Sequence, residues 1–122
     1  MLAAIGAAVV PWKTAALRAR WEAPCAQPGA PARVIVRAPD APDGGVAEIT
    51  VVIETPTERL VRPSERVVLR DGSGELALSL DYPYEGRVAG SYRYWAEVRV
   101  GALVARTERP IAYSVRDARW FA

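Results

Sequence analysis

Hydrophobic and polar residues alternate with a period of two along most of this chain from residue 17 onward. In one stretch, Ala47, Ile49, Val51 and Ile53 take every second position, and the residues between them are mostly polar. This period is typical of a strand with one buried face and one solvent-facing face. The pattern predicts seven strands, at residues 17–23, 32–38, 46–55, 65–70, 75–81, 91–100 and 103–115.

Turn-forming residues separate the predicted strands. The connecting segments read PGAP, PDAPDGG, TPTE, RPSE, DGSGE, YPYEG and VGA, and their Gly, Pro and Asp residues supply the backbone angles that tight turns need. Gly72 and Gly74 favour a tight hairpin in Asp71-Gly72-Ser73-Gly74, and Gly101 favours a second one. Pro110 cannot donate a hydrogen bond to a β-ladder, so we expect the last strand to be an edge strand or to carry a bulge there.

A regular series of short strands and turns is typical of an antiparallel β-sandwich. We therefore predict one all-β domain over residues 16–115, between an apolar N-terminal arm at 1–15 and a C-terminal tail at 116–122. The predicted core consists of Trp21, Val34, Val36, Ile49, Val51, Val67, Leu69, Leu76, Leu78, Leu80, Tyr92, Tyr94, Ala96 and Val98.

The segment Gly90-Ser91-Tyr92-Arg93-Tyr94 resembles the tyrosine corner of immunoglobulin-like domains. The resemblance implies an immunoglobulin-like sandwich with Greek-key topology, in which the Tyr92 hydroxyl bonds to the backbone upstream. It also implies that Tyr94 takes the inward position of a disulfide cysteine and faces Val34 or Val36.

A wider resemblance covers the run from Ala19 to Val115, about four-fifths of the chain. The segments ARW, PGAPARVIVRAPDAPDGGVAEITVVIE, VVLRDGSGELALSLDYPYEG and GSYRYWAEVRVGALVARTER are similar to bacterial immunoglobulin-like modules. Such modules are attached to spike and effector proteins of type VI secretion and related contractile systems. The similarity implies a non-catalytic component of a larger bacterial or phage-like assembly.

Composition argues against several other functions. The net charge is +2, and the 16 basic and 14 acidic residues are interleaved, so we expect a solvated charged face and no nucleic-acid partner. The chain has no His, which removes the commonest general base and transition-metal ligand, and Cys25 is its only Cys. No serine lies in a Gly-x-Ser-x-Gly setting. We expect no catalytic, metal-binding or cofactor-binding residue, and no enzymatic activity.

Two acidic segments suggest ligand chemistry. The spacing in DGSGE differs from that of a calcium-binding EF-hand loop, and a hairpin turn explains its residues. Asp81 and Glu85 flank Tyr82 and Tyr84, a combination of carboxylates and aromatic rings that sugar sites use. We interpret this second segment as a connection between strands, and carbohydrate binding through Tyr82 and Tyr84 is the alternative.

Trp95 shares the outward-facing parity of its predicted strand with Arg93 and Arg99. An outward Trp on a sheet suggests one of two arrangements. Arginine stems of adjacent strands could cover the indole and gain a cation–π contact, with Glu48, Glu54 or Arg106 completing a charged face. Alternatively, Trp95, Arg93 and Arg99 anchor a protein contact, since Trp and Arg dominate interface anchors.

The tripeptide Ala-Arg-Trp occurs twice, at 19–21 and at 118–120, 99 residues apart. The second copy lies where the first strand of a following domain would begin. It is a relic of tandem domains, a strand donated to an exposed sheet edge of a neighbour, or a coincidence. Strand donation predicts that Trp120 and Phe121 are buried against a neighbouring surface.

The N-terminal segment MLAAIGAAVVPWK is apolar but short. The residues before Pro11 are about half of what a membrane-spanning helix needs, and no basic residue precedes the apolar run as in a secretory signal. We expect no membrane span and no signal peptide. The segment either packs on the domain or forms an arm that docks on a partner, with Trp12 as a contact candidate.

These observations favour a structural or protein-interaction module. We expect a protein partner or self-association through the apolar arm and the C-terminal tail. We expect synthesis in the cytoplasm, and incorporation into an exported or surface assembly is left open. The alternative function is that of a carbohydrate-binding accessory domain.

Overall fold

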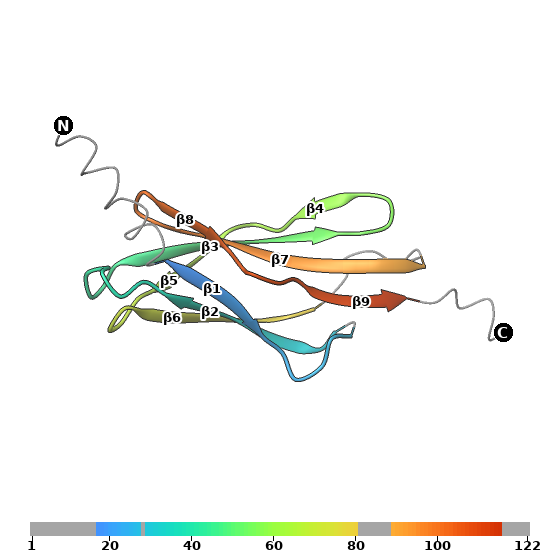
Figure 1. Ribbon diagram of the computed structural model, residues 1–122, viewed down its shortest axis with the longest axis horizontal. Helices are drawn as coiled ribbons and strands as arrows, with labels where there is room; N and C mark the ends of the chain where they lie inside the picture. Colours follow the sequence, from blue (N-terminus) through green and yellow to red (C-terminus); the bar gives the residue numbers. More distant parts are fainter. Residues whose placement is uncertain (1–16, 28, 81–88, 116–122) are drawn as a thin grey trace, which may run out of the picture.

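A computed structural model describes residues 17–27, 29–80 and 89–115 of the chain, and these residues form nine β-strands and no helix (Figure 1). The strands are β1 (Arg18–Glu22), β2 (Pro31–Arg37), β3 (Val46–Glu54), β4 (Arg59–Val61), β5 (Glu65–Val68), β6 (Ser73–Ser79), β7 (Gly90–Val100), β8 (Leu103–Arg106) and β9 (Ile111–Val115). The predicted all-β fold is confirmed.

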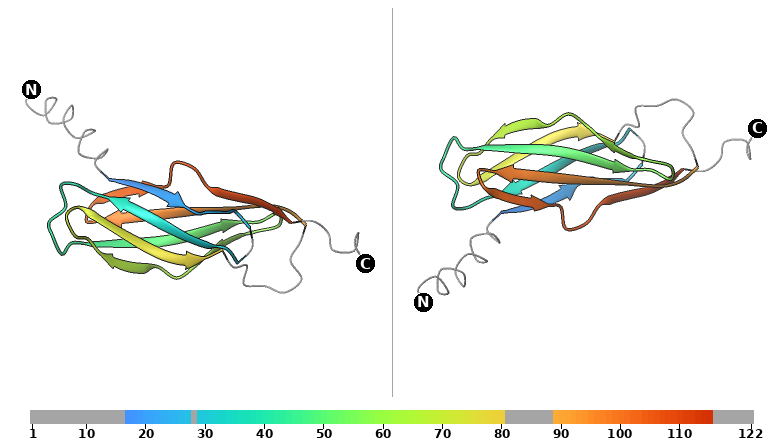
Figure 2. Two further views of the ribbon diagram at one scale, coloured as in Figure 1. Left: turned by 90° about the horizontal axis from the view of Figure 1, so that it is seen from below. Right: turned by 90° about the horizontal axis from the view of Figure 1, so that it is seen from above.

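The strands form two antiparallel sheets that pack face to face as a β-sandwich. One sheet has the order β1-β2-β6, and the other has the order β4-β3-β7-β8 with β5 also paired to β3 and β9 also paired to β7. Since β4 and β5 share one edge of β3, and β8 and β9 share one edge of β7, the six-stranded sheet is four strands wide. Figure 2 shows the three-stranded sheet toward the viewer on the left and the six-stranded sheet on the right.

Most strand ends are shifted by one or two residues from the prediction, and the strands differ from it more deeply at two places. The predicted strand 103–115 is divided into β8 and β9, because Pro110 has no N–H to donate and the ladder to β7 ends at Thr107, whose N–H donates to the Ala96 carbonyl. The short strand β4 was not predicted. Its three residues are too few to show a period, and Pro63 separates it from β5.

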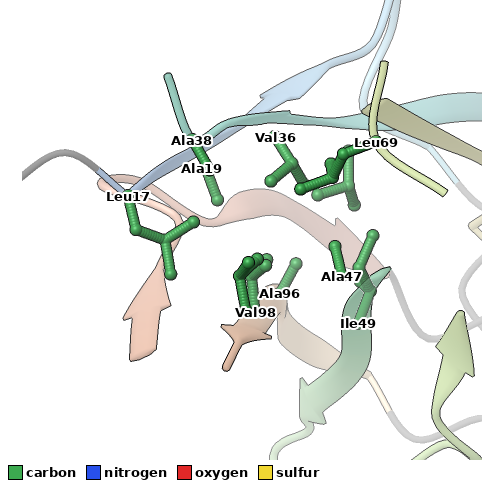
Figure 3. Packing of buried hydrophobic residues seen from close by; sticks show 11 residues of the cluster. Leu17, Ala19, Val36, Ala38, Ala47, Ile49, Leu69, Ala96 and Val98 are labelled. Atoms are coloured by element: carbon green, nitrogen blue, oxygen red, sulfur yellow. The ribbon is translucent and has the colours of Figure 1, made fainter. Parts of the chain in front are cut away.

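The core lies between the sheets and consists of two clusters. The first contains small aliphatic side chains from both sheets, among them Val34, Val36, Ile49 and Val98 (Figure 3). Ten of the fourteen predicted core residues are buried. The other four are partly exposed and pack against the clusters, because they lie on strands at the edges of the sheets: Trp21, Val67, Leu76 and Leu78.

The second cluster is built around three tyrosines. The rings of Tyr92 and Tyr113 stack with centroids 5.6 Å apart, and the hydroxyls of Tyr94 and Tyr113 lie 2.9 Å apart in the interior. Tyr94 shares this cluster with Ala32, whereas Val34 and Val36 belong to the first cluster. The expected opposition of Tyr94 to Val34 or Val36 is therefore wrong, because the bulky ring lies where the facing strand carries alanine.

The tyrosine corner itself stays a prediction. Tyr92 is fully buried at the start of β7, as the resemblance implies. The upstream segment 81–88, where the backbone partner of its hydroxyl was expected, lies outside the described residues.

Two tight turns confirm the predicted hairpins. Asp71 and Gly72 both have positive φ, 52° and 72°, and the flanking Arg70 and Ser73 exchange two backbone hydrogen bonds of 2.9 and 3.0 Å. This is the geometry that an Asp-Gly turn favours. Gly101, with a φ of 58°, turns the chain between Val100 and Leu103.

We predict that Gly72→Ala destabilises the fold more than Gly101→Ala. An added Cβ at Gly72 would lie 2.9 Å from the Cα of Pro39 and 3.0 Å from the Ala38 carbonyl oxygen, whereas nothing lies within 4 Å at Gly101. Gly101→Ala should cost about 1–2 kcal/mol of unfolding free energy for the left-handed backbone, and Gly72→Ala should cost at least about 1 kcal/mol more. Urea denaturation measures both, and equal losses would contradict the packing described.

Candidate functional site

The candidate site is the solvent-facing side of the six-stranded sheet, which we call the outer face. Residues paired across neighbouring strands share a face, so the register fixes its members. They are Val46, Glu48, Thr50, Val52, Glu54, Arg59, Val61, Arg66, Val68, Ser91, Arg93, Trp95, Glu97, Arg99, Val104, Arg106, Ala112 and Ser114.

Exposed hydrophobic side chains gather on the outer face. Among the described residues, the four exposed large hydrophobics are Val46, Val61, Val68 and Val104, with 43–58% of their surface accessible. All four point outward from this one sheet. Single exposed apolar residues need no explanation, but several on one face indicate an interaction surface.

Trp95 lies near the middle of the outer face and is held by two neighbours. Its indole Nε1 donates a hydrogen bond of 2.8 Å to a Glu54 carboxylate oxygen on β3. The Arg106 guanidinium from β8 lies 3.9 Å from the ring centroid, a cation–π contact. Val52, directly opposite Trp95, is only 3% exposed although it points outward. Because the indole reaches across to Glu54 on β3, we infer that it covers Val52. The contacts with Glu54 and Arg106 hold the ring in one orientation.

The sequence predicted part of this arrangement. An arginine of an adjacent strand, Arg106, lies over the ring as one of the two predicted arrangements has it, and Glu54, which was expected only in the surrounding charged face, bonds to the indole. The indole nevertheless stays half-buried. A sugar ring stacking on Trp95 would have to displace Arg106 from the ring face that it covers.

Charges on the two central strands of the outer face are sorted by strand. Glu48 and Glu54 lie on β3, and Arg93 and Arg99 lie on β7. The register pairs Glu48 with Arg99 and Glu54 with Arg93. In both rows an acidic residue of β3 therefore lies beside a basic residue of β7, and Glu97 of β7 lies between the two arginines opposite Thr50. Arg93 and Arg99 were predicted as interaction residues, and both are exposed on this face.

A small polar hollow indents the outer face. It has a volume of about 160 Å³ and lies among Glu48, Thr50, Glu97, Arg99 and Val104. Its size suits one side chain of a partner better than a free ligand, since ligand pockets have volumes of about 300–1,000 Å³.

The opposite side of the sandwich carries a network of ion pairs. Arg33 on β2 bonds to Glu22 on β1 and to Glu75 on β6, the latter at 3.3 Å, and Arg20 bonds to Glu22 at 3.3 Å. The charges of Glu22 and Glu75 raise the pKa of Arg33. Because these side chains are 40–63% exposed, solvent screens the pairs and they contribute little to stability.

Two larger hollows were not predicted from the sequence. One, of about 430 Å³ and mostly apolar, is lined by Glu22, Ala23, Pro24, Pro31, Ala32, Arg33, Ala77 and Leu78. The other, of about 360 Å³, lies between Trp21 and the β8–β9 connection at Glu108–Ile111. The Trp21 indole nitrogen is buried and has no hydrogen-bond partner among the described residues.

Several predicted contact residues lie outside the described residues. They are Trp12 in the N-terminal arm, Tyr82 and Tyr84 between β6 and β7, and Trp120 and Phe121 in the C-terminal tail. The proposed roles of these segments stay predictions. The four exposed valines were not predicted as interaction residues. The alternation of inward and outward positions along the strands nevertheless places Val46 and Val104 on the same face of the sheet as Trp95.

Within residues 17–27, 29–80 and 89–115, no three His, Cys, Asp or Glu side chains gather where they could hold a metal ion, and Cys25 is exposed. No helix long and apolar enough to cross a bilayer occurs in the same ranges. What the outer face offers is an immobilised Trp, exposed valines and sorted charges, which are the elements of a protein interface.

The fold defines the class of the protein as an antiparallel β-sandwich. No protein-family model matches the chain, and no curated protein matches it significantly.

We predict that the Arg106–Trp95 contact stabilises the fold by about 0.5–1 kcal/mol, the range of an exposed cation–π pair. Arg106→Ala should lower the unfolding free energy by this amount in the natural chain and by nearly nothing when Trp95 is already replaced by Ala. Arg18→Ala, an exposed arginine on the other sheet, is the matched control. An unchanged loss in the Trp95→Ala background would show that Arg106 acts elsewhere.

Proposed function

We propose that the chain is a non-catalytic structural or protein-interaction module that binds a protein partner through the outer face. The observation that carries the proposal is the half-buried Trp95, held by Glu54 and Arg106 among exposed valines. Interfaces gain most of their energy from a few Trp, Tyr and Arg anchors. An anchor that is already fixed loses less conformational entropy on binding.

We propose further that the module belongs to a larger bacterial or phage-like assembly, such as a contractile tail or a secretion spike. The support is the resemblance of the run from Ala19 to Val115 to immunoglobulin-like modules of such systems. The strand orders β1-β2-β6 and β4-β3-β7-β8 support an immunoglobulin-like arrangement with Greek-key connections. The binding role itself rests on the outer face and not on this resemblance.

The experiment is a comparison of Trp95→Ser with the unchanged full-length chain. Each is incubated with a lysate of the cells that make the protein, and captured proteins are identified after cross-linking. We expect Trp95→Ser to weaken capture at least about tenfold, as loss of an anchor does, while circular dichroism still shows a folded β-protein. Ile35→Ser is the matched control, because Ile35 is a half-buried residue of the central strand in the other sheet.

Equal capture by Trp95→Ser and the unchanged chain would contradict the proposal. A panel of cell-wall oligosaccharides, followed by tryptophan fluorescence, tests the carbohydrate alternative on the same proteins. Quenching that depends on Trp95 would favour carbohydrate binding in place of a protein partner.

A further inference from the structure

We infer that the outer face binds a second copy of this chain. The two copies are related by a two-fold axis that lies between their facing sheets, parallel to the strands and above the line midway between β3 and β7. The inference rests on the proposed function and names the partner. It is carried by the arrangement of charges on the outer face, which is complementary to itself in this orientation and in no other aligned one.

The two-fold axis places β3 of one copy over β7 of the other. Glu48 then faces Arg99 of the second copy, and Glu54 faces Arg93 of the second copy, because each pair lies in the same row of the sheet. Every such contact occurs twice in a symmetric dimer, since the same patch is used on both sides. In both rows the acidic residue of each copy meets the basic residue of the other, and Glu97 of each copy faces Thr50 of the other.

The apolar residues meet in the same arrangement. Val52 and Trp95 form one row, and Val52 is buried, so the axis brings the Trp95 indole of each copy, which covers its own Val52, toward the indole of the other, with exposed Val61 beside it. The charged rows lie on both sides of this apolar row. A central apolar contact surrounded by charged residues is the usual anatomy of a protein interface.

The opposite orientation is disfavoured by the same charges. An axis perpendicular to the strands would place Glu48 over Glu54 and Arg99 over Arg93, because it reverses the order of the rows. Like charges that face each other across an interface repel and disfavour that orientation. Two sheets that pack in the aligned manner keep their strands within about 30° of each other. Residues close to the axis therefore stay opposite their partners in the other copy.

The size of the outer face is that of a stable interface. Four strands about 4.8 Å apart and nine residues long, at about 3.3 Å each, make a face of roughly 19 Å by 30 Å. Its accessible area is larger than this projection because side chains stand out from it. Standard interfaces bury about 800 Å² per partner, which is of the same order.

The outer surface of the three-stranded sheet does not offer the same complementarity. Its charges Glu22, Arg33 and Glu75 are already paired within the chain, and Arg18 lies opposite Arg37. None of the exposed large hydrophobics of the described residues lies there.

The test is a charge exchange between copies. Sedimentation velocity on the purified full-length chain should show a dimer. Glu48→Arg and Arg99→Glu should each weaken dimerisation at least about tenfold, because each turns two attractive contacts into two repulsive ones. An equimolar mixture of the two variants should dimerise again, since each reversed side chain then faces an opposite charge. Arg37→Glu, an exposed reversal on the central strand of the other sheet, should leave the dimer unchanged.

Circular dichroism and urea denaturation check that each variant is folded. If either one is not, the neutral variants Glu48→Gln and Arg99→Gln replace them, and their equimolar mixture should regain one of the two charge contacts. A chain that stays monomeric at the highest attainable concentration would overturn the inference, as would a mixture that fails to dimerise. If the monomeric chain still captures a partner in a Trp95-dependent way, the proposed function holds and the partner is a different protein. If neither occurs, both fail.

Discussion

The pairing of β3 with β7 is the constraint on which the rest of the structure depends. Seven residue pairs, from Glu48 with Arg99 to Glu54 with Arg93, fix which side chains of the two central strands face the core. Because side chains alternate, a slip of one residue would exchange the two faces and bring the charged rows inside. Burial of Ile49 and Ile53 against the other sheet holds the register.

The interior is divided along the length of these two strands. Toward one end, β7 contributes Ala96 and Val98 to a cluster of small aliphatic side chains. Toward the other end it contributes Tyr92 and Tyr94, whose rings pack with Ala32 of the facing sheet. Large side chains thus lie opposite small ones. This complementarity lets two sheets pack at an even separation with few voids.

The same register produces the outer face. Trp95 reaches across to Glu54 because the two lie in adjacent rows on adjacent strands, and Arg106 of the hairpin strand β8 reaches the ring from the other side. The fixed indole and the strand-sorted charges are both consequences of one pairing. Under the proposed function, this fixed arrangement would lower the entropic cost of binding a partner.

The sequence by itself determined the period of two, the turns and therefore the buried side of most strands. Each strand buries one face, so burial is visible in a local pattern, and the Asp71-Gly72 turn is local too. The placement of Trp95 outward with Arg93 and Arg99 was also predictable. Which strand pairs with which was decided only by the tertiary structure. The pairing of β6 with β2, the existence of β4 and the opposition of acidic β3 to basic β7 depend on contacts between residues distant in the chain, and no local pattern encodes them.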